Sequence, residues 1–447
     1  MTTTRTLAEF IADTEFESLP SPVVEAAKIA ILDGVANMAA GSVQELADII
    51  GRYVRDAGGT SQASVIGWGY KTNPPSAAFA NGVFGHCLDY EIQGFPPTHG
   101  TSSCLPSALA LAEQHNAPGS RVITAYVLGW EIQGRLRAAS APATRTGYHP
   151  PGLVGPLGGA AASSKTLGLD ADQTLMALGI AASRTGGLTA NTGTMVKSTH
   201  PGNAARMGAE AGILAGMGYT ASDEVLESPV GYAAALFGGE FDWDIATGGL
   251  GASWRLIDPG FDIKRFPAQV YIQNAIEAAL NLRDENGILA DDIERVTIRR
   301  QGRGHSGPVP RSGLDGKFSV EYCAAAALLD GRVGIDTFTD ARRFSPDMDE
   351  MLGRIGVEPE GPESGATQAT AVLKDGRTVS AECSAFSGSA SNPMSREQRL
   401  EKVRDCFVRA LSDSDTERVL EMLENLESLD DTAQLMAVLG QAAAGRN

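Results

Sequence analysis

Apolar residues recur every three or four positions from Thr6 to about Asp262, and Gly, Pro or Ser stands at most ends of the recurring segments. This spacing places apolar side chains on one face of a helix, so the pattern predicts successive α-helices. It returns after Ser391-Asn392-Pro393, which predicts a helical C-terminal tail. The expected helices cover residues 20–41, 42–59, 75–90, 102–116, 120–140, 396–411 and 413–429.

A different pattern lies between these helical regions. Residues 294–300 alternate and are β-branched, and residues 367–383 form two alternating runs around Asp375-Gly376, which predicts a β-hairpin. The length of 447 residues exceeds what one core usually serves. We therefore expect a mainly α protein, in which residues 1–262 and 391–447 form a large helical domain and residues 263–390 form a smaller α+β lid domain.

Two segments rich in Ala and Gly, residues 155–169 and 202–218, allow helix backbones to approach closely. They predict an interior of helices packed on helices.

Composition and charge narrow the functional classes. A hydrophobic fraction of 43% without a long apolar run argues against a membrane span, and no secretory signal is visible at the N-terminus. Five cysteines without CxxC spacing predict reduced thiols in a cytoplasmic protein. The net charge of −18 argues against nucleic-acid binding. An anionic substrate would need a locally basic pocket.

Several common catalytic motifs are missing from the sequence. It contains no GxGxxG after a strand, no GxxxxGK[ST], no GxSxG and no HExxH. The six histidines also lack metal-like spacing, which argues against a bound cation. Nucleotide redox chemistry, P-loop hydrolysis and zincin proteolysis lose their usual signatures.

The candidate chemistry lies where helices are expected to start or stop. Asp89 ends one helix, and His99 stands in a Pro-rich loop before the next. The first turn of that next helix, near Thr101 and Ser102, would present free backbone N–H groups to an anion. His149 precedes two prolines and a glycine-rich helix start, although a His-Pro pair is more often structural. Lys197 and His200 stand just before a helix that we expect to open at Pro201 or Gly202. Free backbone N–H groups at such a start favour an anion.

Two further segments have both a functional and a structural interpretation. Lys264 and Arg265 lie at the proposed domain boundary, where a solvated basic pair is the alternative. His305 lies in a Gly-rich loop that could reach across a cleft or could be a mobile surface residue. His86 is expected to pack or cap a helix, and His115 to lie at an exposed helix end.

Taken together and in this order, these segments resemble the MmgE/PrpD family. The resemblance implies a homodimer without cofactors, and a pocket between the domains that holds a small anionic polycarboxylate. By the same resemblance, the pocket of this chain would contain Asp89, His99, His149, Lys197 and Lys264, with His305 in a lid loop. The segments that carry the resemblance are ILDGVANMAAGS, NGVFGHCLDYE, GYHPPGLVGPLGGAAASSKTLGL, GTMVKSTHPGNAARMG, IKRFPAQVYIQNAIEAAL and KFSVEYCAAAALLDG.

The resemblance implies a reaction in which this chain breaks a C–H bond next to a carboxylate. His99 and His149 suit proton transfer, Lys197 suits stabilisation of the developing charge, and Asp89 would orient a neighbour. Binding of substrate is expected from the remaining candidates, namely Lys264, His200, Arg265 and His305.

Two departures from the dehydratase-type pattern bear on the substrate. The chain has Asp89-Tyr90-Glu91 where many relatives have a second acid directly after the aspartate, and Gly100 where they have proline. We therefore expect epimerisation of iminodisuccinate, ahead of dehydration of a 2-methylcitrate-like acid or decarboxylation of the cis-aconitate type. A non-catalytic carboxylate-binding protein is the alternative from another class.

Overall fold

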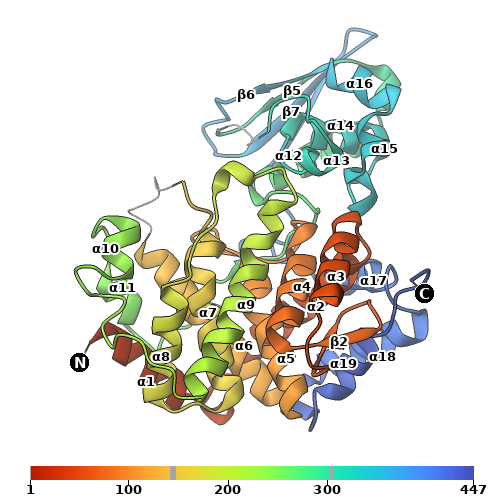
Figure 1. Cartoon of the computed structure of the whole chain (residues 1–447). Coiled ribbons are helices and arrows are strands. Elements are labelled where there is room, and N and C mark those ends of the chain that lie inside the picture. The colour runs from red at the N-terminus through yellow and green to blue at the C-terminus, as the bar shows by residue number, and fades with distance from the viewer. Residues whose placement is uncertain (1, 141–146, 303–305, 447) are drawn as a thin grey trace.

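The computed structural model describes residues 2–140, 147–302 and 306–446, and it shows a mainly α-helical protein with a smaller α+β part at one end (Figure 1). The fold class expected from the sequence is confirmed. Long helices packed side by side form the larger part: α1 (Thr3–Asp13), α2 (Ser21–Ser42), α3 (Glu45–Ala57), α4 (Pro74–Cys87), α5 (Thr101–His115), α6 (Gly119–Ala139), α7 (Pro150–Leu167), α8 (Ala171–Ala182), α9 (Val196–Gly216), α10 (Tyr232–Phe237) and α11 (Trp243–Thr247).

The C-terminal tail packs against the N-terminal helices (Figure 1). The largest hydrophobic core draws on residues from both ends of the chain, including Val23 and Leu435. An ion pair of 2.6 Å between Asp33 of α2 and Lys402 of the tail adds a polar contact in the same place. The tail helices are α17 (Arg396–Phe407), α18 (Asp413–Glu424) and α19 (Ala433–Leu439).

The smaller part is a four-stranded sheet covered by helices, with strand order β6-β5-β7-β8. The predicted hairpin is confirmed: the last two strands pair antiparallel, with Val372 opposite Thr378 across the Asp-Gly turn. Its core is separate and draws on residues between 266 and 386. The elements are α12 (Gln273–Asn286), β5 (Ile293–Arg299), α13 (Gly313–Gly316), α14 (Val320–Asp330), α15 (Asp340–Arg343), α16 (Pro346–Leu352), β6 (Ile355–Glu358), β7 (Thr367–Leu373) and β8 (Thr378–Cys383).

Two short strand pairs complete the described fold. The first joins β1 (Ala63–Val65) to β2 (Tyr70–Thr72), and the second joins β3 (Gln93–Gly94) to β4 (Phe261–Asp262). The β3–β4 pair holds the segment after α4 beside the chain that leads into the smaller part. Within the described ranges, no helix is long and apolar enough to cross a membrane.

Helices α7 and α9 pack with their backbones in close contact, as the Ala- and Gly-rich segments predict. A β-carbon added at Gly208 would lie 2.3 Å from the carbonyl carbon of Gly159. Since real β-carbons do not approach backbone so closely, glycine is required there. This contact sets how closely the two helices pack at their middles.

The start of α9 differs from the prediction. The helix begins at Val196, so Pro201 and Gly202 lie inside it. Proline is favoured in the first turn of a helix, which is why the sequence predicts a start there. Lys197 and His200 are therefore first-turn helical residues, and the backbone N–H of Gly202 is not a donor at a helix start.

Candidate active site

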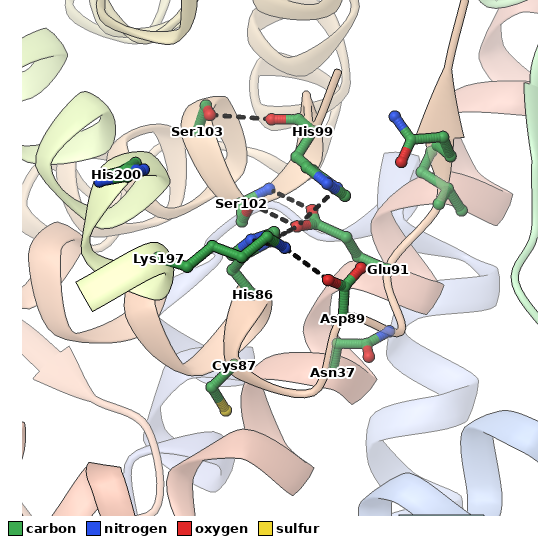
Figure 2. A network of polar contacts seen from close by, with 12 residues as sticks. Asn37, His86, Cys87, Asp89, Glu91, His99, Ser102, Ser103, Lys197 and His200 are labelled. Carbon is green, nitrogen blue, oxygen red and sulfur yellow. Dashed lines mark hydrogen bonds and ion pairs between the residues drawn. The ribbon is translucent and has the colours of Figure 1, made fainter. Parts of the chain in front are cut away.

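Asp89 lies between two lysines, Lys197 and Lys264, in a buried polar cluster. Figure 2 shows Asp89 beside Lys197 and near His86 and Glu91. Lys197 of α9 donates from Nζ to Asp89 Oδ2 at 2.5 Å, and Lys264 donates to Asp89 Oδ1 and to its carbonyl oxygen, the latter at 3.0 Å. Asp89 adopts a left-handed backbone conformation with φ of 50° after the end of α4. That turn points its carboxylate toward both ammonium groups.

The charges of this triad depend on one another. Burial by itself would raise the pKa of Asp89, but the ammonium groups of Lys197 and Lys264 outweigh burial and hold the pKa well below its usual range. Burial lowers the pKa of Lys197, and Lys264 adds to the lowering while Asp89 opposes it. Lys197 is thus a poorly solvated cation stabilised by one carboxylate.

His86 stands in the middle of the cluster, where sequence reasoning expected a packing residue. Its Nε2 lies 3.0 Å from Lys197 Nζ, and its Nδ1 lies 2.7 Å from an oxygen of Glu91. Burial, followed by the nearby Lys197, holds the pKa of His86 well below its usual value. The ring is therefore neutral. The one signal in the sequence is that His86 stands three residues before Asp89, near the end of α4.

Three further histidines surround this centre. His99 packs edge-on against His86 with ring centroids 4.4 Å apart, and His149 lies 6.1 Å from His99 by the same measure. The Nδ1 atoms of His149 and His200 are 3.0 Å apart, so one of them must carry the shared hydrogen. Burial lowers the pKa of all three rings, and Lys197 or Lys264 adds to the effect.

Glu91 supplies an internal anion at the start of α5. The sequence predicts that the N–H groups near Thr101 and Ser102 are open to an anion. The structure instead gives the Ser102 N–H to a Glu91 oxygen at 2.9 Å, and the Ser102 hydroxyl donates to the other oxygen at 2.6 Å. Burial raises the pKa of Glu91 to about 7, although the bonds from Ser102 oppose the rise. In the sequence, Glu91 stands out only as part of the departure from the dehydratase-type pattern.

Lys317 is a third lysine of the cluster, and sequence reasoning missed it. It comes from the smaller part of the chain and donates from Nζ to the carbonyl of Cys87, at the end of α4, at 3.1 Å. Burial lowers its pKa to about 8, and Asp89 works against the lowering. The only signal in the sequence was its place just before the capped, apolar helix α14.

The structure does not bring every candidate into the cluster. The guanidinium of Arg265 lies 3.3 Å from Glu277 and is partly exposed. Its backbone carbonyl accepts a bond from Tyr90. The Arg265 guanidinium therefore makes its ion pair outside the cluster, unlike the ammonium group of the preceding Lys264. His305 lies outside the described residues.

A metal would meet unfavourable charge here. His86, His99 and His149 each offer a nitrogen within 4.8 Å of the other two, which is a plausible grouping for a cation. However, the Lys197 ammonium is 3.0 Å from His86 Nε2, and the other nitrogen of His86 already contacts Glu91. A dication would have to displace an ammonium group, so these residues fit a metal poorly.

Exposure separates two layers of the cluster. His149 and Lys197 are 9% and 8% exposed and His99 is 6% exposed, whereas Asp89 and Glu91 are 3% and 1% exposed. The first three are the more accessible members of the cluster. Asp89 and Glu91 are buried more deeply, so they act on a bound molecule through the residues that they contact. The arrangement thus offers neutral imidazoles beside a buried ammonium, which suits proton transfer with charge stabilisation.

Comparison with known proteins identifies the family of the chain. Residues 5–244 match the MmgE/PrpD N-terminal domain, and residues 266–428 match the MmgE/PrpD C-terminal domain. The chain belongs to the MmgE/PrpD family. Its relatives include the cis-aconitate decarboxylase of Homo sapiens, which is 32% identical over 98% of this chain and 94% of the relative.

More distant members of the MmgE/PrpD family extend the range of activities. The cis-aconitate decarboxylase of Aspergillus terreus is 28% identical over 95% of this chain and 93% of its own length. The 2-methylcitrate dehydratase of Escherichia coli K12 is 30% identical over 62% of this chain and 61% of its own length. These homologues are enzymes that act on small polycarboxylates according to their names.

Proposed function

We propose that this protein catalyses the making or breaking of a bond at a carbon next to a carboxylate in a small polycarboxylic acid. The observation that carries the proposal is Lys197, a buried ammonium held by Asp89 and His86 beside the neutral rings of His99 and His149. A C–H bond next to a carboxylate is a very weak acid. A base alone therefore acts too slowly, and the charge that develops on the carboxylate needs stabilisation.

The charge balance supports an anionic substrate. Lys197, Lys264 and Lys317 share Asp89 as their fully ionised neighbour, while Glu91 titrates near neutrality. The cluster is thus locally basic within a chain of net charge −18. A substrate carboxylate bound at Lys197 would complete the neutralisation of the lysines.

The proposed steps use the more exposed layer of the cluster. His99 or His149 takes or delivers the proton at carbon, since each ring is neutral and can accept one. Lys197 stabilises the enolate-like charge through its ammonium group. General acid–base transfer of this kind contributes roughly a hundredfold or more to rate.

Decarboxylation of a cis-aconitate-like acid is the outcome that the relatives favour, because the decarboxylases align over nearly the whole chain. In that reaction the bond from carbon to one carboxylate breaks, carbon dioxide leaves, and the electron pair stays on carbon. The remaining carboxylate delocalises that charge, and an imidazole that has taken up one proton from solvent then delivers it to the carbon. Atoms and charge balance without an oxidant.

Epimerisation of iminodisuccinate is the second candidate. It requires proton removal on one face of the carbon and delivery on the other. His99 and His149 come from different elements and their ring centroids are 6.1 Å apart, which leaves room for one carbon between them. Dehydration of a 2-methylcitrate-like acid would add the loss of a hydroxyl to the same first step.

Replacing Lys197 tests the proposal. In Lys197→Ala we expect turnover of the active acid in a panel of cis-aconitate, 2-methylcitrate, citrate and iminodisuccinate to fall by about a hundredfold or more, because the charge-stabilising donor is lost. Product formation is followed by NMR, and binding by calorimetry. Lys374→Ala, at an exposed lysine outside the cluster, is the matched control and should keep full turnover.

The same measurement distinguishes a binding protein from an enzyme. If the unmodified protein binds an acid of the panel but forms no product, while Lys197→Ala loses only affinity, the enzymatic proposal is wrong. An active Lys197→Ala variant would equally contradict the role given to this lysine.

A further inference from the structure

A continuous line of polar contacts runs behind the substrate-facing layer. Glu91 lies 2.7 Å from His86 Nδ1, His86 Nε2 lies 3.0 Å from Lys197 Nζ, and Lys197 lies 2.5 Å from Asp89. Glu91, His86 and Asp89 have little or no exposure. Their effect on a substrate therefore has to pass through Lys197, or through His99, whose Nδ1 lies 3.4 Å from a Glu91 oxygen.

We propose that Glu91 and His86 form a proton relay that interconverts Lys197 between its ammonium form and a free amine. The inference rests on the proposed function, because it gives Lys197 a second role as a base during the reaction. Glu91 is a positioning residue in this scheme and does not touch substrate.

Hydrogen accounting at His86 supports the relay. A neutral imidazole carries one N–H. With the hydrogen on Nδ1, His86 donates to the Glu91 carboxylate and accepts from the Lys197 ammonium at Nε2. With the hydrogen on Nε2, His86 donates to a Lys197 amine and accepts from a protonated Glu91. Both arrangements satisfy every group in the line.

The two arrangements differ by two concerted proton transfers. Lys197 gives one proton to His86 Nε2, and His86 gives the proton on Nδ1 to Glu91. A lysine cation and a glutamate anion become a neutral amine and a neutral carboxylic acid, and the imidazole remains neutral. Total charge and proton count are unchanged, and no co-reactant is required.

Burial brings the two arrangements close in free energy. It raises the pKa of Glu91 to about 7 and lowers the pKa of Lys197, so a proton is shared more evenly than in water. Asp89 favours the ammonium form of Lys197, whereas Lys264 disfavours it. The titratable and charged groups that face Glu91 are His86 and Cys87 of α4, Asp89, His99, Cys104 of α5, Tyr126 of α6, Lys197 of α9 and Lys264.

The backbone around Glu91 is held firmly enough for a relay. Asp33 accepts the N–H of Ile92 at 3.2 Å, and Lys402 donates to the carbonyl of Tyr90 at 2.8 Å. Ser102 binds both oxygens of the carboxylate. Glu91 therefore keeps its orientation toward His86 in either protonation state.

The relay predicts a specific pH profile. Below a pH of about 7, Glu91 already holds a proton and cannot receive another through His86, so kcat should rise with pH through about 7. Glu91→Gln cannot take up the proton. We expect this variant to lose the rise of kcat with pH, which is the acidic limb of the profile. Its kcat should fall by about a hundredfold, with KM changed much less. Ser102→Ala removes a bond that stabilises the carboxylate, so its limb should move to higher pH.

Glu113→Gln is the matched control. Glu113 is also buried and binds the N–H and hydroxyl of a serine, Ser64, each at 2.6 Å, but it has no histidine partner among the described residues. The control should keep the profile of the unmodified protein. Nitrogen-15 NMR of His86 provides a second readout without substrate. The Nε2–H tautomer requires a Lys197 amine, so it should be populated above a pH of about 7, where Glu91 can receive the relayed proton, and should be lost as the pH falls through that value.

The two readouts separate the relay from the proposed function. A His86 tautomer that stays constant between pH 6 and 8 (a range of about one unit on either side of the Glu91 pKa), or a limb that persists in Glu91→Gln, would overturn the relay even in an active enzyme. A tautomer change that Glu91→Gln abolishes supports the relay. If it occurs in a protein that turns over no polycarboxylate, the proposed function fails and the relay stands.

Discussion

Asp89 is the residue on which the charge balance of the cluster depends. Its carboxylate contacts both Lys197 and Lys264, and it is almost fully buried. Removing one member of such a group leaves the others as uncompensated buried charges, which costs more than the group gained by forming. The stability of the folded protein therefore depends on whether the lysines that contact Asp89 are protonated.

Asp89→Asn tests this link at the residue scale. Asparagine tolerates the left-handed backbone of this position, so the change removes charge with little strain. We expect the free energy of unfolding in urea to fall by about 3–5 kcal/mol, because two ammonium groups lose their anion. Asp172→Asn removes an exposed partner of Arg5 and should cost less than about 1 kcal/mol. Equal effects of the two changes would contradict this account.

The sequence predicted some residues of the cluster better than others. His149 and Lys197 stand beside proline and glycine at helix starts, and such irregular places attract functional interpretations. His86 lies within a regular helix face, where packing is the usual role of a histidine. Glu91 and Lys317 have no local signal, because their roles depend on partners far away in the chain.

At the scale of elements, the helix α9 sets the position of Lys197. Pro201 lies inside this helix and cannot donate to the carbonyl of Lys197 one turn earlier. The turn that carries Lys197 and His200 is thus less constrained by backbone bonds than an ordinary helix. The sequence predicted the existence of the helix but misplaced its start, since proline usually marks a first turn.

Gly208→Ala tests whether the packing of α7 on α9 positions the site. Alanine in a helix normally favours stability, but here its β-carbon would meet the backbone of Gly159. We expect a loss of about 1–3 kcal/mol and a lower kcat, because the helices carrying His149 and His200 must separate.

Gly216→Ala, near the end of the same helix, is the matched control. Its new β-carbon would meet only the flexible end of Leu169, at 3.3 Å. Thermal unfolding and kcat are measured for both variants. A Gly208→Ala protein as stable and active as Gly216→Ala would show that the close contact does not position the site.

At the scale of the whole molecule, the cluster is assembled from distant parts of the chain. Periodicity predicted the helices, the hairpin and the helical tail, because each is a local property of its sequence. It could not predict that Lys317 reaches the end of α4 from the smaller part, or that Lys402 of the tail supports Tyr90. Contacts of this kind are fixed only when the parts come together.

The most direct test of the central claim is deuterium exchange at the substrate carbon. The protein is incubated in heavy water with cis-aconitate, 2-methylcitrate and iminodisuccinate, and proton NMR follows the positions next to the carboxylates. We predict that one acid gains deuterium at such a carbon, either in its product or by inversion, and that Lys197→Ala abolishes the exchange. Turnover that neither adds deuterium at one of these carbons nor removes a hydrogen from it would contradict proton transfer at carbon as the work of this site.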